Sequence, residues 1–154
     1  MRKRVIGSRG PSASEPRWLD LEGIAEIEIT SEDRDRPIES ALQPGAGPGW
    51  RAGHGGEQII RIIFDQPQRL TRIRLRFVET DIERTQECLL RWSAASGTFR
   101  DIARQQWNFS PSGSTCELED YRVDLSGVTV LELQIVPDKS GGDARASLAE
   151  LRLG

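Results

Sequence analysis

The sequence contains little of the chemistry that most enzymes need. Its 154 residues include one histidine, His54, two cysteines and one methionine. No serine or cysteine lies in a recognisable nucleophile motif, and a triad built on His54 would need partners that are distant in the sequence. We therefore expect a protein that is not an enzyme.

The two cysteines, Cys88 and Cys116, are too few for a disulfide framework. Neither has a C-x-x-C partner or a nearby histidine, which argues against a zinc site. Cys88 alternates with Leu90 and Trp92, so its side chain is predicted to point inward as a small hydrophobe. A bridge between the two cysteines is the alternative, and a reducing compartment disfavours it.

Long apolar runs are also missing, because no segment approaches the roughly 20 apolar residues of a membrane-spanning helix. The basic start at residues 1–4 is not followed by an apolar stretch. This pattern predicts no signal peptide, and the cytoplasm is then the default location. The net charge of −3 argues against general binding to nucleic-acid backbones. We expect neither a nucleic-acid nor a membrane partner.

Alternating apolar and polar residues dominate the rest of the chain, and no long stretch shows the helical period of 3.6. The pattern predicts an all-β protein, an antiparallel β-sandwich of about eight strands with jelly-roll topology. A flexible N-terminal arm (1–17) is expected before one sandwich domain (18–154). Residues 65–68 are predicted to form a turn. The predicted core residues are Ile62, Ile73, Leu75, Phe77, Leu90, Trp92, Leu133 and Ile135.

Three arginines, Arg72, Arg74 and Arg76, line one face of a predicted strand. Guanidinium groups suit phosphate and carboxylate recognition, so the stripe is a candidate anion site. The plainer interpretation is a solvated sheet face. Its cross-strand partners would then be acidic residues such as Glu26, Glu28 or Glu132.

Several motifs follow one another in an order typical of a known superfamily. They are Trp50, Ile60–Phe64 with a turn at Pro67, Ile73–Phe77, Trp92–Gly97 and Ala149–Gly154. This order resembles the galactose-binding-like superfamily, which includes the discoidin (coagulation-factor type C) domains and related carbohydrate-binding modules. The resemblance covers roughly residues 24–154. It implies a jelly-roll domain that binds its ligand through loops at one end.

The chain departs from that superfamily in two respects. Extracellular discoidin domains usually carry cysteines near both ends, and this chain has none there. Many carbohydrate-binding relatives hold a structural calcium, and Glu150 matches the glutamate of their last strand. The loop at residues 40–45 offers no carboxylate, however, and calcium usually takes several. We expect no bound metal and no cofactor.

Two loops carry most of the residues expected to contact a ligand. They are a glycine-rich segment (43–56) and a second candidate loop (107–113), with Arg104 just before the second. Sugars are held by an aromatic platform and by polar groups around the hydroxyls. If both loops emerge at one end, that chemistry comes from Arg51, His54, Arg104, Trp107, Asn108 and Phe109. In the alternative interpretation, Trp107 and Phe109 cap the core and His54 is a solvent-exposed loop residue.

Two functions stay open at this point. The first is a non-catalytic module that binds carbohydrate through loops at one end of the jelly roll. The second is an intracellular protein-interaction or assembly module that does not bind sugar. The sequence does not indicate the oligomeric state.

Overall fold

The computed structural model describes residues 18–43, 45, 47–80, 82–95 and 97–154. The predicted N-terminal arm, residues 1–17, therefore lies outside the described part. The elements are β1 (Ala25–Ile29), α2 (Glu39–Leu42), β2 (Trp50–Arg51), β3 (Gln58–Val78), β4 (Arg84–Ser93), β5 (Phe99–Phe109), β6 (Cys116–Val136), β7 (Ser147–Leu148) and β8 (Glu150–Leu153). The predicted all-β class is confirmed. Within the described residues, no helix has the length and apolar character that crossing a membrane requires.

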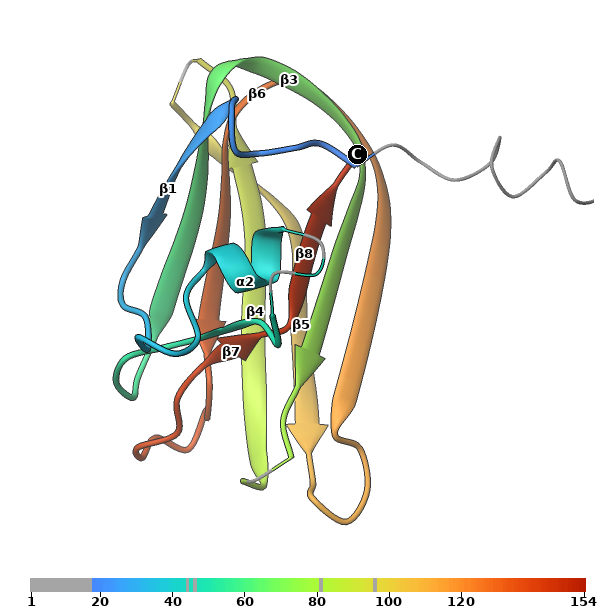
Figure 1. The fold of residues 1–154 in the computed structure, drawn as a ribbon. Helices are drawn as coiled ribbons and strands as arrows, with labels where there is room; N and C mark the ends of the chain where they lie inside the picture. Colours follow the sequence, from blue (N-terminus) through green and yellow to red (C-terminus); the bar gives the residue numbers. More distant parts are fainter. Residues whose placement is uncertain (1–17, 44, 46, 81, 96) are drawn as a thin grey trace, which may run out of the picture.

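Two long strands, β3 and β6, organise the two layers (Figure 1). They pair antiparallel, and three register shifts interrupt the pairing between Ile63 and Arg72. Such irregularities bend a strand pair, and both strands arch over one end of the molecule (Figure 1). One layer has the strand order β1-β3-β6-β4-β5, and in the other the second half of β3 lies between β8 and β6.

The predicted turn at residues 65–68 is wrong, because β3 runs through this segment without reversing. The pairing of β3 with β6 stops at Ile63 and resumes at Gln68. Pro67 lies in this gap, where its missing N–H removes no ladder hydrogen bond. The polar residues that suggested a turn therefore mark the bend between the two layers.

Seven of the eight predicted core residues are buried between the layers, and Trp92 is the exception. Trp92 is half-buried, and the guanidinium carbon of Arg100 lies 5.9 Å from its ring centroid. The pairing of β4 with β5 shifts register between Leu90 and Arg91. Strict alternation ends there, and Ser93 is buried in place of Trp92.

A short covering layer closes one side of the sandwich. β1 and β8 both pair with the side of β3 that faces away from β6. They are therefore the edge strands of the two layers on this side. The described residues between positions 30 and 57 run across this side. They include α2 and β2, and β2 pairs antiparallel with β7. Ala41 and Trp50 of this layer are fully buried. The loops that follow β2, β3, β5 and β6 lie at the end opposite the bend (Figure 1).

Candidate functional site

The two aromatic residues predicted to form a sugar platform lie in the core. Trp107 and Phe109 belong to β5 rather than to a loop, and they are 8% and 1% exposed. The Trp107 ring packs on Phe77 with 5.0 Å between centroids, and its Nε1 donates a hydrogen bond to Glu119 over 3.2 Å. Their placement matches the alternative considered for them, in which both rings cap the core.

The other predicted residues do not form one cluster. Arg104 is exposed on β5 and lies 2.6 Å from the Glu87 carboxylate. Asn108 accepts a hydrogen bond of 2.8 Å from the Thr85 hydroxyl. His54 is exposed, and its Nδ1 is 2.9 Å from the carbonyl oxygen of the adjacent Gly55. Of the six predicted residues, Arg51 alone lines the groove described next.

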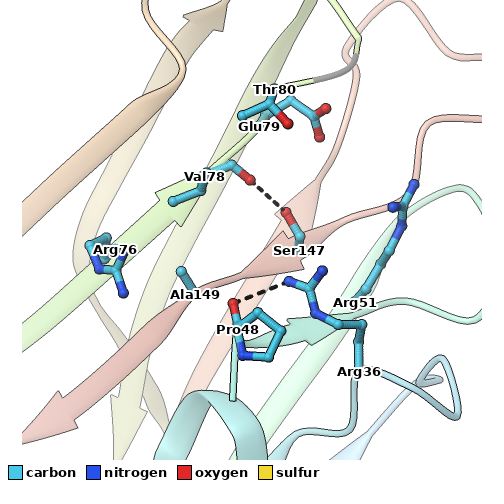
Figure 2. A pocket seen from close by; sticks show the side chains of 9 residues that line it. All are labelled: Arg36, Pro48, Arg51, Arg76, Val78, Glu79, Thr80, Ser147 and Ala149. Carbon is cyan, nitrogen blue, oxygen red and sulfur yellow. Dashed lines mark hydrogen bonds between the residues drawn. The ribbon is translucent and has the colours of Figure 1, made fainter. Parts of the chain in front are cut away.

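This groove, of about 370 Å³, lies where the end of β3 meets β2 and β7 (Figure 2). We call it the arginine groove, because three guanidinium side chains line it. No aromatic side chain is among its described lining residues. They are Arg36, Pro48, Arg51, Arg76, Val78, Glu79, Thr80, Ser147 and Ala149.

Backbone pairing places three of these residues side by side. Arg51 is the register partner of Ser147 in the β2–β7 pair, and its backbone N–H donates to the Arg36 carbonyl over 3.1 Å. The neighbouring Trp50 side chain points the opposite way, as alternation in a strand requires. It is fully buried, and its Nε1 donates to the Ser31 carbonyl over 3.0 Å. Trp50 therefore anchors the short strand that presents Arg51.

Gly49 allows β2 to lie close against the segment that joins β7 and β8. Its φ of +113° belongs to the region that favours glycine. A Cβ at this position would lie 2.5 Å from the Leu148 carbonyl oxygen and 2.6 Å from the Ala149 Cα. Both of those atoms are backbone atoms, so the contact could not be relieved by a side-chain rotation.

None of the three groove arginines has a close acidic partner among the described residues. Arg36 donates from Nε to the Gly49 carbonyl over 2.9 Å and from a terminal nitrogen to the Pro48 carbonyl over 3.2 Å. The Nε of Arg76 lies 3.7 Å from the Glu150 carboxylate. The Arg51 side chain has no ion-pair or hydrogen-bond partner within the described part of the chain. Positive charge in the groove is therefore incompletely compensated.

The groove carboxylate, Glu79, is neutralised from inside the protein. Its oxygen lies 2.9 Å from a terminal nitrogen of Arg84, whose side chain is 1% exposed. Burial lowers the pKa of Arg84, and the Glu79 charge acts against that shift. Arg84 also donates to the Arg145 carbonyl over 2.8 Å. Glu79 consequently offers little negative charge to offset the three arginines.

A second hollow, of about 380 Å³, is lined in part by Arg84. It contains two of the predicted residues, Asn108 and Phe109, together with the carboxylates of Glu83 and Asp138. The Asn108 amide is bonded to Thr85, and the Phe109 ring is buried. This hollow therefore offers less free binding chemistry than the arginine groove.

The arginine stripe divides between two surroundings. Arg72 forms two hydrogen bonds of 2.8 and 2.6 Å with Asp120, and Arg74 lies 3.3 Å from the same carboxylate. The Trp18 ring lies 5.2 and 5.3 Å from these two guanidinium groups. Only Arg76 of the three lines the groove.

The stripe has acidic partners, as expected, but their predicted identity is wrong. The partners are Asp120 and Glu150. Two of the residues predicted for this role, Glu28 and Glu132, instead pair with Arg61 in the other layer, at 3.4 and 3.7 Å.

In the described residues, no group of three or more His, Cys, Asp or Glu side chains could hold an ion. Glu150 lies between Arg76 and Arg152, 3.7 and 3.9 Å from their Nε atoms. Both cysteines are free, with Cys88 buried and Cys116 exposed. Burial raises the pKa of the Cys88 thiol.

Comparison with solved structures identifies the fold of this chain. No protein-family model matches the sequence, and no curated protein is significantly similar to it. Among solved structures, the CBM32 module of AlyQ in complex with 4,5-unsaturated mannuronic acid has a TM-score of 0.64 and 14% identity, covering 90% of this chain and 98% of that one. The chain has the galactose-binding-like fold of these carbohydrate-binding modules.

Two further structures have the same fold. A CBM32 module from Clostridium perfringens in complex with GalNAc-β-1,3-galactose has a TM-score of 0.62 and 18% identity, over 89% of this chain and 99% of that one. A pectin-binding carbohydrate-binding module has a TM-score of 0.60 and 13% identity, over 85% of this chain and 90% of that one. Some related modules are parts of enzymes, since a truncated AlyQ structure contains a CBM32 and an alginate lyase domain.

Proposed function

We propose that this protein is a non-catalytic carbohydrate-binding module that holds its sugar in the arginine groove. The observation that carries the proposal is an open groove, lined by three guanidinium side chains, on a fold whose structural neighbours are in complex with sugars. A sugar presents many hydroxyls, which need donors and acceptors arranged around them. The groove offers guanidinium N–H groups from Arg36 and Arg51 and the hydroxyl of Ser147.

Binding without catalysis suits the groove chemistry. Glycoside hydrolysis usually requires two carboxyl groups on either side of the scissile bond. Of the described lining residues, Glu79 alone carries a carboxylate, and it is paired with Arg84. A bound sugar would therefore meet no pair of acid and base groups.

The alternative, a protein-interaction module, has less support. Large exposed apolar patches mark many protein interfaces. In the described part of the chain, the large hydrophobic residues classed as exposed are Val78, Ile82 and Leu118. Three such residues do not favour an apolar docking face over a polar sugar site.

A glycan array that displays neutral and acidic oligosaccharides tests the proposal. We expect the purified protein to bind at least one class of glycan. Arg51→Ala should weaken that binding, because it removes the unpartnered guanidinium of the groove. Arg104→Ala is the matched control, since Arg104 is an exposed β5 residue paired with Glu87. Absence of binding to any glycan by the folded protein would contradict the proposed function.

A further inference from the structure

We infer that the arginine groove recognises acidic sugars, and that Arg51 binds the carboxylate of a uronic acid unit. The inference rests on the proposed function and names the class of sugar. It comes from the chemistry of the groove wall rather than from the fold.

The described wall of the groove has no aromatic side chain. Neutral sugar rings commonly bury an apolar C–H face against an aromatic side chain, which supplies flat apolar area. The described lining residues include no Phe, Tyr or Trp. Trp50, next to Arg51 in the sequence, and Trp107, which was predicted to form the sugar platform, are both buried. Affinity must therefore come from polar contacts, among which those to a charged group are the strongest.

Arg51 is the groove residue best suited to bind an anion. Its guanidinium has no partner in the described residues, so binding an anion breaks no existing ion pair. A guanidinium presents a planar fork of donors that matches a carboxylate with two parallel hydrogen bonds. The backbone at Arg51 is held by its pairing with Ser147 and by its hydrogen bond to Arg36. Arg51 therefore combines an unpartnered guanidinium with a backbone held by hydrogen bonds, as an anion-binding residue requires.

Arg36 and Arg76 add positive charge to the groove. Arg36 donates to two neutral carbonyls, which satisfy its N–H groups without cancelling its charge. Arg76 shares the Glu150 carboxylate with Arg152 at 3.7 and 3.9 Å. Glu79 is already neutralised by Arg84. The groove is therefore cationic in a chain whose net charge is −3.

The arrangement of the arginines also favours a ligand with more than one carboxylate. Figure 2 shows Arg76 and Arg51 at opposite ends of the groove, with Arg36, Ser147 and Ala149 between them. Two separated cations match acidic groups on different units of one chain. We therefore expect an oligouronate to bind more tightly than a uronic acid monosaccharide.

Isothermal titration calorimetry with one pair of ligands isolates the carboxylate. The pair is a galacturonate trisaccharide and its fully methyl-esterified form, which keeps the ring and loses the charge. We expect the acid form to bind at least about 10-fold more tightly, as a hydrogen bond to a charged group predicts. Its affinity should also fall as NaCl is raised from about 50 mM to about 500 mM, because salt screens exposed charges.

Variants locate the contact. Arg51→Gln should lower affinity for the acid trisaccharide by about 10-fold or more and lower affinity for the ester by much less, because the ester meets Arg51 only through neutral groups. Arg51→Lys should recover part of the loss, since it restores charge without the fork. Arg104→Gln should change neither ligand. Thermal melting of each variant checks that it is folded.

The outcomes separate the two claims. If neither trisaccharide binds and the glycan array is also negative, the proposed function fails. If the array or the titration shows sugar binding but the ester binds as tightly as the acid, the module stands and the acidic-sugar inference is overturned. Preference for the acid that survives Arg51→Gln overturns the assignment to Arg51.

Discussion

Trp107 was predicted to stack against a sugar, but its ring lies in the core. Its ring packs on Phe77 at 5.0 Å, and it is 8% exposed. Trp107→Ala should therefore lower the free energy of unfolding by about 3–5 kcal/mol, measured by urea denaturation. Trp107→Phe keeps most of the packing and should leave sugar affinity within about 2-fold of the unmodified protein, because Trp107 is not among the described lining residues of the groove. Loss of binding in a fully stable Trp107→Phe variant would argue for a direct contact.

Asp120 should give the protein a measurable acid sensitivity. Hydrogen bonds from the Arg72 guanidinium lower the pKa of this carboxyl to about 2, whereas an unfolded chain has a value of about 3.9. A lowered folded-state pKa stabilises the fold above pH 4, and this contribution is lost as the pH falls towards 2. Asp120→Asn removes it. The stability difference between the two proteins, from urea denaturation at each pH, should shrink from pH 5 to pH 2, and a constant difference would contradict the assignment.

At the residue scale, the sequence analysis selected one of the three groove arginines, Arg51, as a site residue and missed the other two. Arg51 could be selected because it lies in a glycine-rich loop segment beside a tryptophan. Arg36 had no motif around it. Arg76 belonged to a stripe whose plainer interpretation was a solvated sheet face, with an anion site as the alternative. Their meeting depends on the pairing of β2 with β7. Strands of two residues are too short to show alternation, so no periodic signal marked this pair.

At the element scale, alternation located most of the strands but not their continuity. The segments around Ile62 and Ile73 were predicted as two strands joined by a turn, and they are two halves of β3. The sequence does not distinguish a bend from a turn here, because both are polar and tolerate proline. The distinction is made by β6, which pairs with both halves of β3. The pairing joins residues that are far apart in the sequence, so the local pattern at residues 65–68 does not predict it.

Gly49 tests the covering layer that builds the groove. Gly49→Ala would place a Cβ 2.5 Å from the Leu148 carbonyl oxygen and force a strained φ. We expect a loss of at least about 1–3 kcal/mol of unfolding free energy, together with weaker sugar binding. Gly23→Ala is the matched control, because its Cβ would meet nothing within 4 Å. Unchanged stability and binding in Gly49→Ala would show that β2 does not pack on the β7–β8 segment as described.

At the scale of the whole molecule, net charge is a poor guide to the binding surface. The chain carries a net charge of −3, yet the groove concentrates guanidinium groups whose partners are distant, shared or neutral. Elsewhere, arginines such as Arg72 and Arg91 are closely paired with carboxylates, at 2.6 and 3.0 Å. Total composition cannot separate these two populations. The fold could therefore be predicted from patterning, while the site depended on which charges the fold leaves unpaired.

The central claim is that sugar binds in the arginine groove, and the most direct test is an NMR titration of the isotope-labelled protein with a galacturonate trisaccharide. We predict that the backbone amide signals of Arg36, Arg51 and residues 147–149 shift together with increasing ligand. Signals from residues 104–109 of β5 should stay in place. Shifts confined to β5, or to the face around Arg72 and Arg74, with the groove signals unchanged, would contradict the account.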